Sequence, residues 1–196
     1  LGFIYVDTGA LYRSIAYTLN AKGITTEETD KIEATLKETR IDIKFIDGEQ
    51  HVMVNAQDVS SEIRTAEVSM LASAFSALPI VREYLLGLQR RMAEENNVIM
   101  DGRDIGTVVL PNATVKIFLT ADPEDRAKRR YDEMIEKGIA ANYEEVLEDI
   151  KKRDYNDSHR AVAPLKPAED SIVVNTTGNT FEQSVEQLAN IIKSNI

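Results

Sequence analysis

The sequence predicts an α/β protein, in which a parallel β-sheet carries helices on both faces and a small α+β insert interrupts the first half. Three observations support this fold class. Four short apolar runs alternate with longer amphipathic segments, two alternating runs flank Asp47-Gly48, and helix-capping residues precede several amphipathic segments. Short continuous apolar runs are typical of parallel strands buried on both faces. We therefore expect these four runs to form one doubly wound sheet.

The apolar runs predict strands at residues 3–6, 98–100, 115–119 and 172–174. Apolar residues at helical spacing predict helices over residues 11–19, 66–78, 81–95 and 181–192. Pro79 separates the second of these helices from the third, because proline cannot continue a helix interior. Two more helices follow from caps, since Asp122 precedes Pro123 and Asn142 stands three residues before Glu145.

The segment between the first two core strands has a different pattern. Residues 41–46 and 51–54 alternate apolar and polar side chains around Asp47-Gly48, a dipeptide typical of tight hairpin turns. This pattern predicts an antiparallel hairpin inserted into the core. We therefore divide the chain into a core of residues 1–34 and 76–196 and an insert of residues 35–75.

The composition of the 196 residues excludes several functions. The formal net charge is −10, so nucleic acid and acidic membranes would be repelled at long range. There is no cysteine, which excludes disulfides, thiolate zinc sites and cysteine nucleophiles, and His51 and His159 are the two imidazoles. No apolar run reaches the ~20 residues of a membrane span. We expect a cytoplasmic protein without nucleic-acid or membrane partners.

Charged residues collect where two of the predicted strands end. Asp7-Thr8-Gly9 follows the first strand, with Arg13 one helical turn later, and Asp101, Arg103 and Asp104 follow the second. Ligands of doubly wound sheets bind at the carboxyl ends of the strands. Two arginines beside carboxylates at that edge fit an anionic ligand with additional hydrogen-bond donors. The alternative is a pair of turns whose charges are paired only locally.

Two more basic clusters lie in predicted helices. The first comprises Arg126, Lys128, Arg129 and Arg130. Asp122 could pair with Arg126, and Asp125 with Arg129, so this cluster is interpreted as a solvated, salt-bridged face. In the second cluster, Arg153, Asp157 and Arg160 fall at i, i+4 and i+7 and would share one helix face. Two guanidinium groups beside a carboxylate can bind a phosphate and a sugar hydroxyl together.

Six motifs in order resemble those of bacterial cytidylate kinases, which phosphorylate CMP and dCMP with ATP. The motifs are DTGALYR, SSEIRT, LPIVRE, MDGRDIGTVV, VKIFLTADPEDRAKRR and RDYNDSHRAVAPL, and the resemblance covers essentially the whole chain. It implies a P-loop NTPase-type parallel sheet flanked by helices, the nucleoside monophosphate kinase fold. In that fold the insert binds the nucleoside monophosphate, and a mobile lid covers residues from about 126 to 142. We expect a monomer when the protein is intact.

The resemblance also implies roles for individual residues. The cytosine edge would be read by Thr8, Arg82 and Asp104. The monophosphate would be held by Arg13, Arg103 and Arg160. The sugar hydroxyls would contact Ser73, Arg153 and Asp157. The ATP phosphates would contact Arg126 and Arg130, and Mg²⁺ would be oriented through water by Asp101. The catalytic residues would be Arg103, Arg130 and Arg160.

The sequence departs from the family in one respect. P-loop kinases carry a strand, a G-x-x-x-x-G-K-[ST] loop and a helix, whose loop amides and lysine bind the ATP phosphates. No such motif occurs here. The family's sheet places this strand centrally, between the strands at residues 98–100 and 115–119. We therefore expect that roughly 25 residues, one strand–loop–helix unit containing the central P-loop strand, are missing. Residues 1–196 alone should be a poor kinase.

Two alternative functions remain open at this stage. The first is a non-catalytic nucleotide-binding fragment, since the residues implied for CMP are present and the P-loop is absent. The second is a retroviral-type aspartic protease, whose active site also contains apolar residues followed by Asp-Thr-Gly-Ala. That motif lies in an almost all-β chain in the proteases, whereas Asp7-Thr8-Gly9 here leads into a predicted helix.

Overall fold

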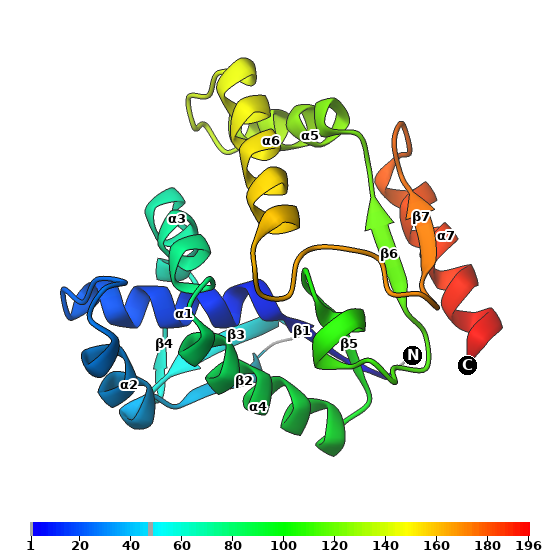
Figure 1. Ribbon diagram of the computed structural model, residues 1–196. Helices are drawn as coiled ribbons and strands as arrows, with labels where there is room; N and C mark the ends of the chain where they lie inside the picture. Colours follow the sequence, from blue (N-terminus) through cyan, green and yellow to red (C-terminus); the bar gives the residue numbers. More distant parts are fainter. Residues whose placement is uncertain (1, 47–48) are drawn as a thin grey trace. The chain divides into compact units, whose positions relative to one another are not determined.

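The computed structural model describes residues 2–46 and 49–196 (Figure 1). Its contacts divide the chain into two compact units, residues 1–102 and residues 103–196, which we call the first and the second unit. The division into a core, an insert at residues 35–75 and a lid stays a prediction.

The first unit combines a parallel strand pair with an antiparallel sheet and helices. Its elements are β1 (Ile4–Asp7), α1 (Thr8–Ala21), α2 (Thr29–Glu38), β2 (Ile41–Ile46), β3 (Glu49–Val54), β4 (Gln57–Asp58), the 3₁₀ helix η1 (Glu62–Arg64), α3 (Ala66–Phe75), α4 (Pro79–Glu95) and β5 (Val98–Asp101). β1 pairs with β5 in parallel, with Ile4 opposite Val98 and Asp7 opposite Asp101. Leu11, Ile15 and Leu19 of α1 are fully buried in its core. The helical spacing of these three residues therefore predicted the buried face of α1 correctly.

The antiparallel hairpin of the insert is confirmed. β2 and β3 pair from Ile41 opposite Val54 to Ile46 opposite Glu49, and β4 adds a third strand. The predicted turn at Asp47-Gly48 lies outside the described residues. The sequence patterns missed β4 and α2. α2 is short, and no side chain caps its first turn, so neither length nor a cap signal marked it.

The second unit contains η2 (a π-helix, Ile105–Val109), β6 (Ile117–Thr120), α5 (Pro123–Glu136), α6 (Tyr143–His159), β7 (Ile172–Asn175) and α7 (Phe181–Asn195). β6 and β7 are parallel, and α5 packs against α6 (Figure 1). The caps agree in part with the sequence. Asn142 accepts a hydrogen bond from the Glu145 amide at 3.2 Å, whereas the Asp122 side chain makes no cap bond to α5.

The four core strands form two parallel pairs and not the predicted single sheet. Within the described residues, β1 pairs with β5 and β6 pairs with β7 in separate sheets. The prediction that these strands are buried on both faces is also wrong in part. Val6 and Val174 are buried, whereas Tyr5 is 46% exposed and Val173 is 61% exposed, so burial alternates along the strands.

No single helix among the described residues is long and apolar enough to cross a membrane. The pair α3 and α4 meets the length and composition requirement only when both helices are counted together, and the two are bent by 100° at their junction.

Asp58 gives the insert a pH-dependent contribution to stability. The Ser60 hydroxyl and amide both donate to Asp58, and His51 Nδ1 lies 2.6 Å from its carboxylate. These hydrogen bonds, first of all the one from the Ser60 hydroxyl, lower the pKa of Asp58 from 3.8 to about 2. The folded carboxyl therefore binds its proton more weakly than the unfolded chain does. Its contribution to stability is present above the ordinary pKa and is lost as the pH falls through the folded value.

We predict that Asp58→Asn destabilises the protein at neutral pH and that the difference from the unsubstituted protein shrinks in acid. The reason is that the unsubstituted protein loses its charged Asp58 as the pH approaches the lowered pKa. Urea unfolding of both proteins at neutral pH and near the lowered pKa measures the difference. A difference of equal size at both pH values would contradict the prediction.

Candidate active site

The junction of β1 and α1 positions the first group of predicted site residues. The apolar run of β1 ends at Asp7, whose side chain caps α1 by accepting a hydrogen bond from the Ala10 amide at 2.9 Å. Thr8 is 3% exposed, and its hydroxyl donates to the main-chain carbonyl of Asp101 at 2.6 Å. The parallel register of β1 and β5 makes this bond possible, because it places Asp101 opposite Asp7.

Arg13, a predicted phosphate ligand, lies one turn further along α1. Its Nη2 atom is 2.9 Å from Asp7 Oδ2, and both side chains are largely shielded, at 19% and 17% exposure. The Nε atom of Arg13 is buried, and no hydrogen-bond partner for it exists among the described residues. A buried donor left unsatisfied costs about 1–3 kcal/mol. The Arg13 side chain as a whole is still partly exposed, so its guanidinium remains accessible to an anion.

Asp101, predicted to orient Mg²⁺ through water, is exposed at the end of β5. The Tyr5 hydroxyl donates to Asp101 Oδ1 at 3.1 Å. Burial, followed by the negative charges of Asp101 and Asp7, raises the pKa of Tyr5, so the phenol keeps its proton and remains a donor. Tyr5 is not among the predicted site residues, because it stands in an apolar strand, where an aromatic residue is expected for packing.

Two further predicted residues lie in the first unit. Arg82 is 9% exposed in the first turn of α4, with Nη1 3.3 Å from the Ser76 carbonyl and the guanidinium 5.9 Å from the Tyr12 ring centre. Ser73 is exposed on α3. The Pro79 break between the two helices was predicted from sequence, and it places Arg82 early in α4.

The second unit gathers predicted residues around Asp157. Asp157 is 9% exposed and accepts a hydrogen bond from Arg103 Nε at 2.7 Å. Arg160 Nη1 lies 4.0 Å from the other carboxylate oxygen. α6 ends at His159, and Arg160 has a non-helical backbone, so the predicted shared helix face does not extend to Arg160. Arg153 lies on α6 one turn before Asp157 and is exposed.

Asp104, the predicted base reader, is 6% exposed and precedes η2. Its main-chain carbonyl accepts hydrogen bonds from the amides of Val108 and Val109, at 2.9 and 3.2 Å. The backbone therefore holds Asp104 in place by contacts that do not involve its carboxylate.

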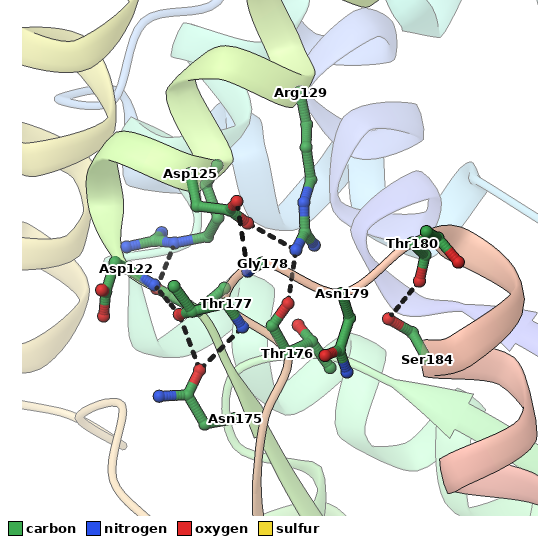
Figure 2. A network of polar contacts seen from close by, with 12 residues as sticks. Asp122, Asp125, Arg129, Asn175, Thr176, Thr177, Gly178, Asn179, Thr180 and Ser184 are labelled. Atoms are coloured by element: carbon green, nitrogen blue, oxygen red, sulfur yellow. Dashed lines mark hydrogen bonds and ion pairs between the residues drawn. The ribbon is translucent and has the colours of Figure 1, made fainter.

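The structure separates the three arginines of α5, which the sequence could not rank. Arg129 donates to the Thr176 carbonyl at 2.6 Å and pairs with Asp125, as predicted (Figure 2). Asp125 also accepts from the Gly178 amide at 3.4 Å, and the Asp122 amide donates to Thr177 at 2.8 Å. Figure 2 shows how these contacts tie the first turns of α5 to the loop between β7 and α7. Arg129 is therefore occupied in a structural role.

Arg126 and Arg130 have different partners. Arg126 pairs with Asp154 of α6 through two hydrogen bonds of 3.1 and 2.6 Å, so the expected pairing with Asp122 is wrong. Arg126 pairs with Asp154 and not with Asp122 because both oxygens of Asp154 accept hydrogen bonds from the planar guanidinium. Such a two-bond arrangement is stronger than a single hydrogen bond. Arg130 is 58% exposed and contacts Glu133 at 3.3 Å. Both arginines lie on the predicted lid.

A cavity lies in each of the two units. One, of about 940 Å³ in the first unit, is lined by Ile41, Tyr84, Leu88 and Arg91 among others. The other, of about 560 Å³ in the second unit, is lined by residues that include Lys128, Tyr131 and Tyr143. None of the described residues lining either cavity is a predicted site residue. The site assignment therefore rests on the side chains themselves and not on a cavity.

Parallel strand pairs with helices, and arginines paired with carboxylates at strand and helix ends, are features of an α/β protein suited to phosphorylated ligands. A comparison with known protein families identifies one that matches nearly the whole chain. The family profile "Cytidylate kinase" matches residues 1–194, and the chain belongs to the cytidylate kinase family.

Curated relatives share this name. A cytidylate kinase of Streptococcus equi is 49% identical over 187 residues, which are 95% of this chain and 83% of that protein. One of Carboxydothermus hydrogenoformans is 47% identical over 194 residues, covering 98% and 86%. One of Leuconostoc mesenteroides is 45% identical over 196 residues, covering 100% and 88%. The family resemblance and the fold class predicted from sequence are thereby confirmed.

These comparisons favour a kinase over both alternative functions. In the structure Asp7-Thr8-Gly9 continues directly into α1, so the motif does not lie in the β-rich surroundings of a retroviral-type protease. Family membership over residues 1–194 likewise favours an enzyme over a non-catalytic binding fragment.

We predict that Asp154→Ala destabilises the protein by about 1 kcal/mol, because it removes both hydrogen bonds that join Arg126 to α6. Asp132→Ala is the matched control, since Asp132 pairs with Lys128 within α5 and both side chains are well exposed. Urea unfolding should show the larger loss for Asp154→Ala. Equal losses in the two variants would contradict a bridging role for Asp154.

Proposed function

We propose that this protein transfers the γ-phosphoryl group of ATP to the 5′-phosphate of CMP or dCMP, giving CDP or dCDP. The observation that carries this proposal is the match of nearly the whole chain to proteins named cytidylate kinase, at 45% to 49% identity. The arginine-rich site residues support it, because both substrates are polyanions.

We assign the monophosphate to Arg13, Arg103 and Arg160. The partial exposure of Arg13, which keeps its guanidinium accessible to an anion, supports its assignment. Arg103 and Arg160 both approach Asp157, which holds guanidinium groups together that would otherwise repel each other. Guanidinium groups bind phosphate oxygens with geometric specificity, because several N–H donors lie in one plane.

We assign the sugar hydroxyls to Ser73, Arg153 and Asp157, and the cytosine base to Thr8, Arg82 and Asp104. Cytosine offers an amine donor and ring acceptors, so a carboxylate, a hydroxyl and a guanidinium are suitable partners. The burial of Thr8, Arg82 and Asp104 supports a role in recognition, because buried polar groups discriminate more strongly than exposed ones.

We assign the ATP phosphates to Arg126 and Arg130. Arg129 is not assigned to this role, because it contacts Asp125 and the Thr176 carbonyl at the loop after β7. Arg126 would have to exchange Asp154 for phosphate oxygens, whereas the exposed Arg130 could turn toward them freely. Arg103, Arg130 and Arg160 are the proposed catalytic residues.

Asp101 would orient Mg²⁺ through water on the protein side. No cluster of three metal-ligating side chains occurs in the described part of the chain. This agrees with the usual mode of Mg²⁺, which keeps several waters and binds through one or two carboxylates together with substrate phosphates. The ion would neutralise phosphate charge. The Tyr5 hydroxyl donates to one oxygen of Asp101 and so helps to orient this carboxylate.

In-line transfer needs the two anionic substrates to approach each other. The arginines oppose the charge on the transferred group, and closure of the lid would exclude water from it. No covalent intermediate is required. We also propose that the protein acts as a monomer in the cytoplasm.

The test is ADP formation by the full-length protein with ATP, Mg²⁺ and one acceptor at a time. We expect turnover with CMP and dCMP and much less with AMP. Equal rates with CMP and AMP, or ADP formation that does not depend on an acceptor, would contradict the proposal.

We predict that Asp104→Ala weakens CMP binding by about 1–3 kcal/mol and leaves the KM for ATP unchanged. The carboxylate is lost, whereas the main-chain contacts of residue 104 with Val108 and Val109 remain. Calorimetric titration with CMP and steady-state kinetics with ATP measure the two effects. Equal losses for both nucleotides would remove Asp104 from base recognition.

We predict that Asp157→Ala lowers kcat/KM for CMP strongly and thermal stability only slightly. The substitution leaves Arg103 without its carboxylate, but that guanidinium is 43% exposed and can be solvated. Kinetics with CMP and a melting curve separate the two effects. A fall in melting temperature with unchanged kinetics would indicate a purely structural role.

A further inference from the structure

Asp7 has no role in the site proposed so far, yet its carboxylate serves two partners. Oδ1 accepts a hydrogen bond from the Ala10 amide at 2.9 Å, and Oδ2 accepts one from Arg13 Nη2 at 2.9 Å. The first contact caps α1 and fixes the carboxylate on the helix end. The second contact then fixes the guanidinium of Arg13 relative to the same helix end.

Gly9 leaves the space that this ion pair occupies. A Cβ atom at position 9 would lie 3.0 Å from Asp7 Oδ1 and 3.1 Å from Arg13 Nη1. Both distances are shorter than ordinary van der Waals contact, so any side chain there would press on the pair. Gly9 has no positive φ that would otherwise call for glycine in the first turn of a helix. Room for the Asp7–Arg13 pair therefore explains this glycine.

The ion pair with Asp7 uses only one nitrogen of the Arg13 guanidinium. Arginine has five N–H donors, and the Asp7 carboxylate accepts from one nitrogen only. Nε is buried and has no hydrogen-bond partner among residues 2–46 and 49–196. A guanidinium that is held in place by Asp7 and is still partly exposed is preorganised to bind an anion.

We propose that Asp7 is a positioning residue for phosphate binding. It holds the Arg13 guanidinium over the first turn of α1 before the nucleotide arrives. This inference rests on the proposed function, because it takes Arg13 as a ligand of the monophosphate. Ordering a long side chain costs conformational entropy. Because Asp7 already orders Arg13 in the folded protein, this entropy is lost during folding and not when the nucleotide binds.

Asp7→Asn separates positioning from capping. Asparagine is as good an N-cap as aspartate, so the hydrogen bond from Ala10 is kept while the charge that holds Arg13 is lost. We expect CMP binding to weaken about 3- to 10-fold, as for the loss of one ordered side chain. The KM for CMP should rise while the KM for ATP stays close to that of the unsubstituted protein, and loss of the largely shielded ion pair should lower the melting temperature by about 2–4 °C.

Gly9→Ala provides a second variant that disturbs the pair without removing its charges. Alanine favours a helix over glycine, so a purely structural view predicts equal or higher stability with unchanged kinetics. We expect a raised KM for CMP with no loss of melting temperature. Asp170→Asn is the matched control, because the exposed Asp170 pairs with Lys116, neither residue is assigned to nucleotide binding, and the substitution should leave CMP binding unchanged.

A double-mutant cycle tests whether Asp7 acts through Arg13. In an Arg13→Gln background, Asp7→Asn should have no further effect on CMP affinity measured by calorimetry. An equal effect in both backgrounds would overturn the proposal, and so would unchanged or tighter CMP binding by Asp7→Asn alone.

The same measurements distinguish failure of this inference from failure of the proposed function. If the unsubstituted protein phosphorylates CMP and Asp7→Asn matches it in every parameter, only the positioning role is overturned. If the unsubstituted protein neither binds nor phosphorylates CMP, the proposed function fails, and the positioning role is overturned with it.

Discussion

The parallel ladder between β1 and β5 is the constraint on which the first-unit site depends. Its register sets Asp7 opposite Asp101, so the start of α1 and the end of β5 lie side by side. The buried Thr8 hydroxyl then joins the two chain segments through the Asp101 carbonyl. Because α1 starts at this point, Arg13 is carried one turn from the strand end. A slip of the register by one residue would separate these groups, since successive side chains of a strand point to opposite faces.

In the second unit, carboxylates of α6 perform the corresponding task. Asp154 holds Arg126 of α5, and Asp157 holds Arg103 at the start of the unit. The protein carries a formal net charge of −10, so an unpaired basic cluster is not its means of attracting a nucleotide. Guanidinium groups are instead held at defined positions by single carboxylates, which makes recognition local and geometric.

The sequence predicts the elements better than the way they assemble. Apolar runs located β1, β5, β6 and β7 within a few residues, and Asp47-Gly48 between alternating runs predicted the β2–β3 hairpin. The pairing of these strands could not be predicted from the sequence, because a continuous apolar run does not specify which strands lie beside it. The apolar runs also did not show that alternate residues such as Tyr5 are exposed. Aromatic side chains occur both in the core and on partly exposed faces of a sheet.

The site shows where sequence motifs stop being informative. The family resemblance selects residue types at given positions, but it does not say which carboxylate holds which arginine. Arg126 pairs with a residue of another helix 28 positions away, a contact that i,i+4 spacing cannot reveal. The reason for glycine at position 9 becomes visible only in the structure, because a side chain there would occupy the space that Asp7 and Arg13 require. The partners of the arginines, rather than the arginines themselves, are therefore what the structure adds to the sequence.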